Sequence, residues 1–363
     1  MGHAVSDLRV GVLGLGVGQL HLLSWLGVDG ASVVAVADTD QARREVAGTN
    51  WSLPSVGSLD DLLDLGLDVV DICTPPAVHE EQVLRCLDAG VHVLCEKPLV
   101  SSVAACDRLA SAAATAVEAT GAVLMPILQY RFGEGAARAR ALVASGGAGR
   151  LFTASAETWW RRDLSYYEEA PWRGTWAGAL GGTVVNHAIH VHDLLTWIGG
   201  PLVELDARTA TRVNDPDLLE TEDCAVGIGR TADGSLVTMN VTLGATTESS
   251  RVRWAFEHVT IESSAEAYHP ARGPWRFEFR DPETEVLATV LWEQLLPTGD
   301  QYVGQFQAFV DALAAGADPP VTIADATASL ELVTAWYASA RTGLPETLPL
   351  PPDHPARGGW APR

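Results

Sequence analysis

VHVLCEKPL, residues 91–99, joins a short apolar run to a Glu–Lys pair. Residues 91–95 follow Gly90 and are mostly β-branched or apolar, and Pro98 interrupts the pattern just beyond them. Such a run predicts a buried strand that ends in a loop. Glu96 and Lys97 would then lie just past the carboxyl end of a strand, where parallel α/β sheets bind their ligands. A surface ion pair at a strand end is the plainer alternative, so the flanking sequence has to decide.

Length, composition and charge limit the classes of protein to consider. A chain of 363 residues is too long for one small core and suits two domains. With 47% apolar and 19% charged residues, the composition is that of a soluble globular protein. The formal net charge of −22 repels phosphate backbones and anionic lipid, which argues against nucleic-acid and membrane partners.

The sequence shows no sign of secretion or membrane insertion. Residues 1–7 lack the basic region and apolar core of a signal peptide, and no apolar run reaches transmembrane length. The five cysteines show no CxxC spacing and fall mostly in apolar patterns, which predicts buried, reduced thiols. We therefore expect a cytoplasmic protein.

A glycine-rich segment follows the first predicted strand. Residues 9–13 form that strand and run directly into Gly14-Leu15-Gly16-Val17-Gly18, before a predicted helix at 19–26. Glycines let the backbone turn sharply and approach a pyrophosphate, which the amides of a helix N-terminus then hold. The third glycine comes one residue earlier than in the GxGxxG pattern, so the strand–turn–helix context carries most of the evidence.

The second predicted strand, residues 32–37, ends at Asp38. An acid at this position accepts hydrogen bonds from the adenosine ribose hydroxyls and repels a 2′-phosphate, which favours NAD over NADP. Arg43 and Arg44 lie close downstream and would weaken that preference, although a solvated helix face explains them equally well.

The alternation of strands and helices continues to residue 126. Further strands are predicted at 68–73, 91–95 and 122–126, with helices between them. Pro75 and Pro76 stop one strand and preset the first turn of the next helix. Repeated units of this kind predict an α/β domain with a doubly wound parallel sheet. The loops that carry Gly14, Thr74 and Lys97 should share one edge of it.

The second half of the chain has a different pattern. Residues 202–290 are mostly β, with a hairpin signal at Ala232-Asp233-Gly234. Strands that follow helices predict an α+β domain with a mostly antiparallel, open-faced sheet. Other expected elements in this half are a strand at 149–157 and helices at 135–145, 184–198, 301–315 and 324–341. The expected division is a dinucleotide-binding domain at 1–128, a substrate and oligomerisation domain at 129–348, and a Pro-rich tail at 349–363.

The helix at 184–198 carries several polar side chains. On an α-helix, Asn186, His190 and Asp193 share one face, whereas His187 and His192 fall on other faces. Those two histidines are expected to hydrogen-bond locally or to face solvent. Catalytic zinc needs three protein ligands, and no further ligand stands at diagnostic spacing, so no metal site is expected.

Aromatic residues are dense between 159 and 176, among Arg161, Arg162 and Arg173. Such clusters commonly form core or oligomer contacts. Stacking on the apolar face of a sugar ring is the functional alternative, and both uses remain open for different members of the segment.

Along almost its whole length the chain resembles the glucose–fructose oxidoreductase / inositol dehydrogenase (Gfo/Idh/MocA) family of NAD(P)-dependent oxidoreductases. The most specific match is Glu96-Lys97-Pro98 in its strand context. The other matches are the glycine loop, Thr74-Pro75-Pro76 with His79, Gln129-Tyr130-Arg131-Phe132, Trp172-Arg173-Gly174-Thr175-Trp176, and Gly181-Gly182 through His190 to Asp193.

The resemblance implies an oxidoreductase that acts on a sugar, sugar derivative or cyclitol. It implies that Lys97 contacts the nicotinamide and the reacting hydroxyl, and that His190 is the acid/base in a cleft between the two domains. Many members have aspartate where this chain has Asn186, so the proton path stays open. The resemblance also implies late helices that return to the first domain and a homodimer or homotetramer formed through the open sheet face.

The expected site residues form three groups. The catalytic residues are Lys97, His190 and Asn186. The cofactor-binding residues are Gly14, Gly16, Val17, Gly18, Asp38, Thr74, Pro75, Pro76, His79, Glu96, Lys97 and Gln129. The substrate-binding residues are Lys97, Arg131, Trp159, Arg161, Tyr166, Trp172, Asn186 and His190.

Two alternatives differ from a dehydrogenase in their chemistry. One is NAD-dependent glycoside cleavage that returns the hydride in each turnover. The other is a non-enzymatic dinucleotide sensor. Sensing would need only the cofactor site, so the presence of both Lys97 and His190 argues against it.

Overall fold

The computed structural model describes residues 7–296 and 299–362, and the N-terminal residues examined for a signal peptide lie largely outside this range. The chain forms two compact units. The first unit runs to Ile127 and includes Tyr302–Thr327, and the second comprises Leu128–Gln301 and Ala328–Arg363. Among the described residues, no helix is long and apolar enough to cross a membrane.

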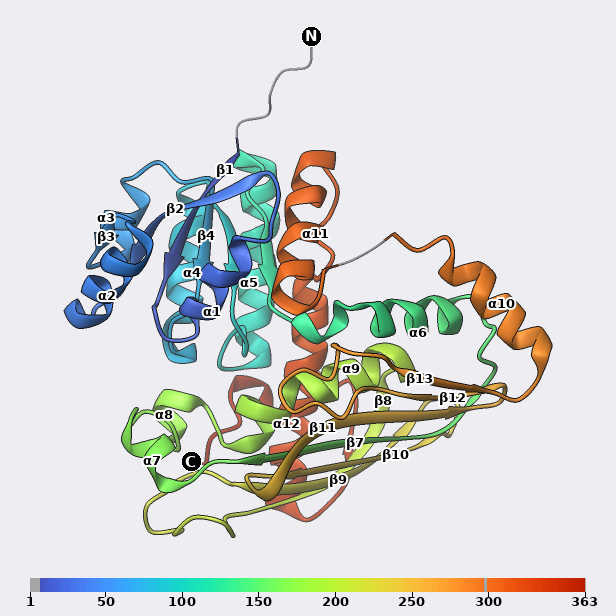
Figure 1. Cartoon of the computed structure of the whole chain (residues 1–363). Helices are drawn as coiled ribbons and strands as arrows, with labels where there is room; N and C mark the ends of the chain where they lie inside the picture. Colours follow the sequence, from blue (N-terminus) through green and yellow to red (C-terminus); the bar gives the residue numbers. More distant parts are fainter. Residues whose placement is uncertain (1–6, 297–298, 363) are drawn as a thin grey trace. The chain divides into compact units, whose positions relative to one another are not determined.

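The first unit contains a six-stranded parallel sheet in the order β3-β2-β1-β4-β5-β6. Its strands are β1 (Leu8–Leu13), β2 (Ala31–Ala37), β3 (Ser55–Val56), β4 (Val69–Ile72), β5 (His92–Cys95) and β6 (Leu124–Pro126). Its helices are α1 (Gly18–Trp25), α2 (Gln41–Trp51), α3 (Leu59–Leu63), η1 (Pro76–Val78), α4 (His79–Asp88), α5 (Val103–Thr120) and α11 (Gln301–Ala315). The first residue of α11, Gln301, is assigned to the second unit. Figure 1 shows α4 and α5 side by side against the strands.

Local sequence signals fix the helix ends in the first unit. The side chains of Asp40, Ser58 and Ser102 accept hydrogen bonds from backbone N–H groups in the first turns of α2, α3 and α5. Gly121 ends α5 with φ +78°, a conformation that glycine adopts without strain. The central strands β4 and β5 are buried on both faces, as a parallel sheet between helices requires.

The second unit contains an eight-stranded sheet in the order β13-β12-β11-β7-β10-β9-β8-β14. Its strands are β7 (Leu151–Arg161), β8 (Leu202–Ala210), β9 (Cys224–Thr231), β10 (Leu236–Thr242), β11 (Gly244–Phe256), β12 (Val259–Glu262), β13 (Arg276–Phe279) and β14 (Glu346–Thr347). All neighbours are antiparallel except β7 and β10. The remaining elements are η2 (Gln129–Arg131), α6 (Glu134–Ala144), α7 (Leu164–Glu168), α8 (Trp176–Ala179), η3 (Val184–Ala188), α9 (Ile189–Gly199), α10 (Pro282–Trp292), η4 (Pro355–Gly358) and α12 (Ile323–Thr342), which begins in the first unit.

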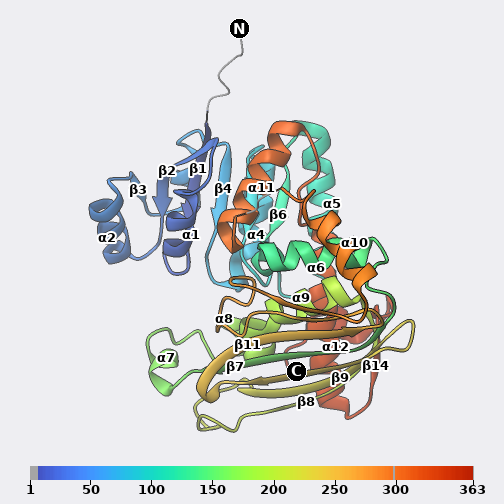
Figure 2. The same ribbon diagram turned by 45° about the vertical axis from the view of Figure 1, so that its right-hand side comes forward.

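Helices cover one face of this sheet. Helix α9 packs on β7 and β11, and Figure 2 shows it along the strand layer. Trp254 of β11 is fully buried and donates a hydrogen bond from Nε1 to the carbonyl oxygen of Leu195 (3.0 Å). Trp336 of α12 is also fully buried and packs over Gly227 of β9, where a Cβ would lie 2.8 Å from its ring.

The predicted fold class is confirmed, with differences in detail. Residues 282–290 were expected to lie in a mostly β region, and they belong to α10 instead. The signal for this helix is local: the Asp281 side chain accepts the N–H of Thr284, and Pro282 stands at the first turn. The tail at 349–363 has only η4 as regular structure, yet Trp360 and Leu350 in it are buried.

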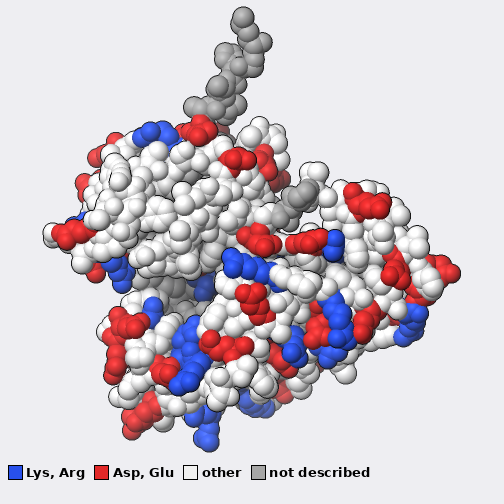
Figure 3. Space-filling model, in the orientation of Figure 1, with Lys and Arg blue, Asp and Glu red and all other residues white. Residues whose placement is uncertain are grey.

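The negative charge is distributed rather than concentrated. On the face drawn in Figure 3, Asp and Glu occur in small groups on both units and are mixed with Arg. Among the described residues, several acids pair with exposed arginines, such as Asp163 with Arg161 and Glu278 with Arg276.

Candidate cofactor and substrate sites

The glycine loop packs directly on the end of β4. Gly14 has φ +94°, and a Cβ there would lie 2.8 Å from the backbone of Cys73, so no other residue fits without displacing main chain. A Cβ on Gly18 would lie 3.1 Å from Cγ1 of Val12. Val17 caps α1, and Gly16 has only Arg43 within 4 Å of a built Cβ. The loop is therefore shaped by its glycines and leads into a helix N-terminus.

Asp38 is held at the end of β2, facing this loop. Its Oδ2 accepts the backbone N–H of Leu15 (2.7 Å), and its Oδ1 accepts that of Asp40 (2.8 Å). Arg43 lies 3.7 Å from the same carboxylate, but its side chain is about half exposed. Each carboxylate oxygen has a second lone pair, so the group can still accept a ribose hydroxyl.

His79 ties two loops of the same sheet edge together. The ring is fully buried, with Nε2 2.9 Å from the carbonyl oxygen of Thr74 and Nδ1 3.0 Å from that of Pro98. Burial lowers the pKa of His79, so the neutral ring donates to one of these oxygens at a time. The side chain of Thr74 donates to Gln82 (2.6 Å), and Pro76 opens η1. His79 thus supports the Thr74 and Lys97 loops from behind, and its contact with a cofactor stays a prediction.

Lys97 is the only lysine in the 363-residue sequence. It follows β5 and is half-buried, and its backbone N–H donates to Oε2 of Glu96 (2.9 Å). Burial lowers the pKa of Lys97 from its usual 10.5, and the negative charge of Glu96 opposes that shift. The first unit therefore presents its single lysine at the edge where the glycine loop and Asp38 also lie.

These residues fit a dinucleotide. The loop around Gly14 leaves room for a pyrophosphate, Asp38 can accept ribose hydroxyls, and Lys97 stands at the end of β5. In the second unit, Gln129 is buried, and its Oε1 has no hydrogen-bond partner among the described residues. A cofactor contact of Gln129 stays a prediction.

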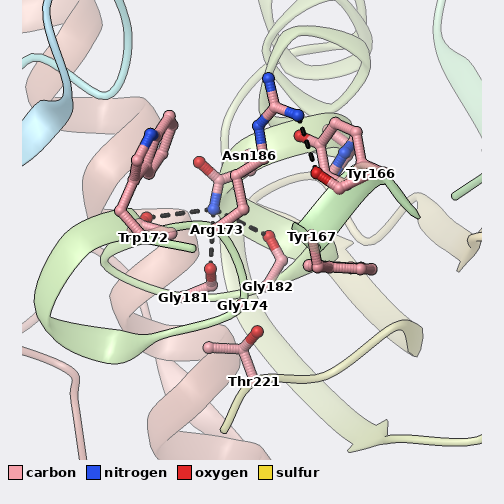
Figure 4. A pocket seen from close by; sticks show the side chains of 11 residues that line it. Tyr166, Tyr167, Trp172, Arg173, Gly174, Gly181, Gly182, Asn186 and Thr221 are labelled. Carbon is pink, nitrogen blue, oxygen red and sulfur yellow. Dashed lines mark hydrogen bonds between the residues drawn. The ribbon is translucent and has the colours of Figure 1, made fainter. Parts of the chain in front are cut away.

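The second unit holds an open cavity, shown in Figure 4. It lies between α7, α8 and η3, and its side-chain lining includes Tyr166, Trp172, Arg173, Asn186 and His187. Apolar ring faces next to a cation and amide groups suit a molecule that carries both hydroxyls and hydrocarbon faces.

Asn186 anchors one wall of this cavity. Its Nδ2 lies 3.0, 2.7 and 3.2 Å from the carbonyl oxygens of Ala179, Gly181 and Gly182, as the dashed lines in Figure 4 indicate. Gly182 cannot carry a side chain, because a Cβ there would lie 2.0 Å from the carbonyl oxygen of Glu222. The amide of Asn186 thus fixes the loop that precedes its own helix.

The helix that carries Asn186 and His190 begins with a π turn. Its first five residues form η3 and α9 starts only at Ile189, so an α-helical face does not describe Asn186 and His190 together. Of the two expectations for His187, a local hydrogen bond or a position facing solvent, the second is wrong: His187 is buried, lines the cavity, and has its ring 5.5 Å from that of Trp160. His192 is also buried, stacked on Trp336, and burial lowers its pKa to about 3.

His190 and Arg131 lie in the interior of the second unit. His190 is buried, and its ring centroid is 5.0 Å from that of Tyr130. Arg131 was expected to bind substrate, but its guanidinium forms a buried bidentate pair with Asp193 (2.7 and 2.8 Å). Ser329 donates to the same carboxylate (3.0 Å). Arg131 therefore holds η2 against α9, and a substrate contact of its own stays a prediction.

Strand alternation separates the aromatic residues of β7. Trp159, expected in the substrate site, is 39% exposed, and its Nε1 donates to Asn240 (3.3 Å) on the open face of the sheet. Trp160 points the other way, is buried, and donates to Ser250 (2.9 Å). Among the described residues, the cavity lining does not include Trp159 or Arg161, and Arg161 is an exposed partner of Asp163. Trp172 is therefore the tryptophan that lines the cavity, Trp160 packs on His187 behind it, and a substrate contact of Trp159 stays a prediction.

Two arginines accompany the cavity aromatics, and neither was among the expected site residues. The guanidinium of Arg173 lies 4.1 Å from the ring centroid of Tyr166 and donates to the carbonyl oxygen of that residue (2.8 Å). Arg162 lies 5.0 Å from the same ring and donates to the hydroxyl of Tyr268 (2.9 Å). The position of Arg173 within the WRGTW motif was the signal that could have identified it.

One further cluster lies in the first unit. His21, Asp71 and Cys73, all buried, bring potential metal-ligating atoms within 4.8 Å of one another among the described residues. No spacing pattern in the sequence marks this group, because strand pairing and helix packing bring it together. Structural zinc sites use four protein ligands, so three do not complete one.

The sequence profile of the GFO/IDH/MocA oxidoreductase family, NAD-binding Rossmann fold, matches residues 8–122. The profile of the GFO/IDH/MocA C-terminal domain matches residues 136–262. Inositol 2-dehydrogenase 1 of Saccharopolyspora erythraea is 30% identical over 252 residues, which are 60% of this chain and 64% of that protein. The match thus covers less than two thirds of that relative.

Two longer matches extend over nearly the whole chain. D-glucoside 3-dehydrogenase of Escherichia coli is 24% identical over 364 residues, covering 93% of this chain and 97% of that protein. The crystal structure of the WlbA dehydrogenase from Bordetella pertussis, in complex with NADH and UDP-GlcNAcA, has a TM-score of 0.81 at 26% identity. It covers 95% of this chain and 100% of that one. With the glycine loop, Asp38 and the Glu96–Lys97 loop in the positions described, the chain belongs to the GFO/IDH/MocA family of NAD-binding oxidoreductases.

Proposed function

We propose that this protein transfers a hydride between a secondary hydroxyl of a sugar, sugar derivative or cyclitol and the nicotinamide of NAD. The observation that carries the proposal is the single lysine, held by Glu96 at the carboxyl edge of a parallel sheet beside a glycine loop. The relatives named for inositol and for glucosides support the same class of substrate.

NAD, when bound, supplies the hydride acceptor, and the chain supplies charge and a proton acceptor. Lys97 stabilises the negative charge that develops on the substrate oxygen by a charge-assisted hydrogen bond. His190 takes the hydroxyl proton. Asn186 acts indirectly, because its amide holds the loop at 179–182 that borders the cavity.

The cavity of the second unit is proposed to hold part of the substrate. Tyr166 and Trp172 offer ring faces to the C–H side of a sugar, and Arg173 offers N–H donors to its oxygens. His187 adds a ring nitrogen to the polar groups that line the same cavity.

The test is an activity panel with purified protein and NAD. Inositols, glucosides and nucleotide sugars are supplied in turn, and the absorbance of NADH is followed. Both the initial rate and the final amount of NADH are recorded. NADH formation with at least one of them, abolished in Lys97→Ala, supports the proposal. Cleavage of an aryl glycoside without net NADH would favour the hydride-returning glycosidase, and NAD binding without turnover of any substrate would favour the sensor.

A further inference from the structure

A chain of buried charged groups lies behind Lys97. His21 of α1 is fully buried, with Nδ1 2.9 and 3.0 Å from the two carboxylate oxygens of Asp71 on β4. Its Nε2 lies 3.2 Å from Oε1 of Glu96, which follows β5. One imidazole therefore bridges two carboxylates from neighbouring strands of the first unit.

With both carboxylates ionised, the bridge requires a charged ring. A neutral imidazole has one N–H and could donate to only one of the carboxylates, whereas imidazolium donates to both. Burial, the largest single effect, lowers the pKa of His21, but the contributions of Asp71 and Cys73 together outweigh it and raise that pKa well above its usual value. Two buried carboxylates thus share one cation.

Other groups facing the bridge leave this charge pattern intact. Trp25 donates from Nε1 to Asp71 (2.9 Å), and the ring of Tyr302 packs 4.4 Å from that of His21. Cys73 Sγ lies 3.2 Å from Nδ1, and burial raises the pKa of this thiol, which is therefore neutral. Burial likewise raises the pKa of the neighbouring Cys95 thiol.

Glu96 connects the bridge to Lys97. Its Oε1 accepts from His21 and from the hydroxyl of Tyr302 (2.8 Å), while its Oε2 accepts the backbone N–H of Lys97 (2.9 Å). Both oxygens are therefore fixed. The same carboxylate supplies the negative charge that opposes the effect of burial on Lys97.

We propose that His21 is a positioning residue for Lys97: as imidazolium between Asp71 and Glu96, it keeps the Glu96 carboxylate ionised and in place beside the lysine. The proposal rests on the proposed function only in taking Lys97 as the group that stabilises the substrate oxygen. The role of His21 in setting the protonation of Lys97 can be measured without any substrate.

Removing the charge of His21 has a defined consequence. Asp71 and Glu96 would remain buried with no cation between them, and buried carboxylates in that position take up a proton or move apart. Either response withdraws negative charge from Lys97. The lysine then loses its counter-charge and releases its proton at a lower pH.

Because Lys97 is the only lysine, its titration can be followed alone. Protein labelled with [¹³Cε]lysine, with no lysine in any purification tag, gives one lysine signal, recorded without cofactor against pH. Glu96→Gln should lower the pKa of Lys97 by about one unit or more, and His21→Gln should lower it by less. His92→Gln is the matched control: this partly buried histidine of β5 accepts only the N–H of Val123 (3.2 Å), and its loss should leave the titration unchanged.

An unchanged or raised pKa of Lys97 in His21→Gln would overturn the proposal, because His21 would then act at most as one more positive charge near the lysine. Stoichiometric zinc in the isolated wild-type protein would also overturn it, since Nδ1 would be a ligand and not a donor. If His21→Gln does not fold, the ring ¹⁵N shifts of the wild type decide: His21 must be doubly protonated at pH 8, and a neutral ring contradicts the role.

Turnover adds a separate readout where a substrate is known. His21→Gln should lower kcat at least tenfold and leave KM for NAD within about twofold, because the glycine loop keeps its own contacts. If no substrate is turned over by the wild type, the proposed function fails, while the lysine titration still decides the role of His21.

Discussion

Lys97 and His190 are proposed to act on the same hydroxyl by different means, and the pH dependence of turnover separates them. Lys97→Ala should lower kcat by roughly 10²–10³ across the accessible pH range, because it removes a charge that stabilises the developing oxyanion. His190→Ala should lower kcat by roughly 10²–10⁴ and remove the acidic limb of alcohol oxidation. The measurement is a kcat/KM pH profile of the three proteins with NAD in excess.

A second titrating group has to be controlled for in that profile. Glu222 lies behind the cavity loop, and burial raises its pKa to about 7. Glu222→Gln should keep the acidic limb that His190→Ala removes. An acidic limb that survives in His190→Ala and disappears in Glu222→Gln would mean that the carboxyl group, not the imidazole, controls activity.

Asp38 should decide the choice of cofactor. NAD should bind more tightly than NADP, and Asp38→Ser should narrow the ratio of their dissociation constants, because the 2′-phosphate no longer meets a carboxylate. Titration of intrinsic tryptophan fluorescence with each nucleotide measures this ratio. Equal or tighter binding of NADP by the wild type would contradict the role of Asp38.

The cavity assignment predicts a contrast between neighbouring residues. Arg173→Ala and Trp172→Ala should each raise KM for the substrate, roughly tenfold or more for the arginine, while the affinity for NAD stays constant. Trp159→Ala removes an equally large side chain from the open sheet face and should leave both constants unchanged. A rise in KM for Trp159→Ala alone would place the substrate elsewhere.

At the scale of single elements, the sequence predicted most where one physical requirement dominates. The strands at Val69–Ile72 and His92–Cys95 consist mostly of apolar residues because both faces of a parallel sheet are buried, and Asp71 is the exception within β4. Gly14 could be predicted as a tight turn because only glycine fits there. These features need no knowledge of distant residues.

The errors arose where distant packing decides. A period of 3.6 residues was assumed from Val184 onward, whereas the π turn at Val184–Ala188 shifts His187 into the cavity lining. Strand alternation separates Trp159 from Trp160, but the sequence does not say which face of β7 the helices cover. The bridge between Asp71 and Glu96 was missed because His21 is 50 residues from Asp71 and 75 from Glu96.

The loop that joins α8 to η3 should respond to pH through Glu222. Its carboxylate accepts the N–H groups of Gly182 and Val184 and the hydroxyl of Tyr337. The folded-state pKa of about 7 is raised, mainly by burial, above the usual 4.5. The stability linked to this group is therefore complete below pH 4.5 and is lost as pH rises through about 7.

Replacing Glu222 tests whether this stability is lost as pH rises. The difference in unfolding free energy between Glu222→Gln and wild type should change by about 3 kcal/mol in favour of the variant from pH 5 to pH 9, since the amide cannot ionise. Urea unfolding at several pH values measures the difference. A gap between the two proteins that does not change with pH would show that Glu222 is not held at a raised pKa.

At the scale of the whole molecule, each unit supplies different residues for the proposed function. The first has the glycine loop, Asp38 and the only lysine of the chain, and the second has the cavity and His190. The fold class could be predicted from the sequence because strands and helices alternate in the first half and strands predominate in the second. The assembly of subunits is harder to predict from the sequence, because it depends on which side chains the folded sheet exposes and not on a periodic sequence pattern.

The open face of the eight-stranded sheet is where assembly should occur. Val226, Ile228 and Leu236 are 50, 59 and 61% exposed and lie on one face of β9 and β10, with Ile228 opposite Thr238. The intervening residues point to the buried side, where Gly227 meets Trp336. Exposed apolar side chains grouped in this way mark contact surfaces more often than they mark solvent-facing sheet.

We therefore expect a homodimer or homotetramer in solution, formed through this face. Ile228→Glu places a charge in the centre of the surface and should shift the species seen by light scattering coupled to gel filtration toward the monomer. Val286→Glu is the matched control, because Val286 is 63% exposed on α10, away from β9 and β10, and this variant should assemble as the wild type does. A wild-type protein that is monomeric at micromolar concentration, or an Ile228→Glu variant with unchanged mass, would contradict the assignment of this face.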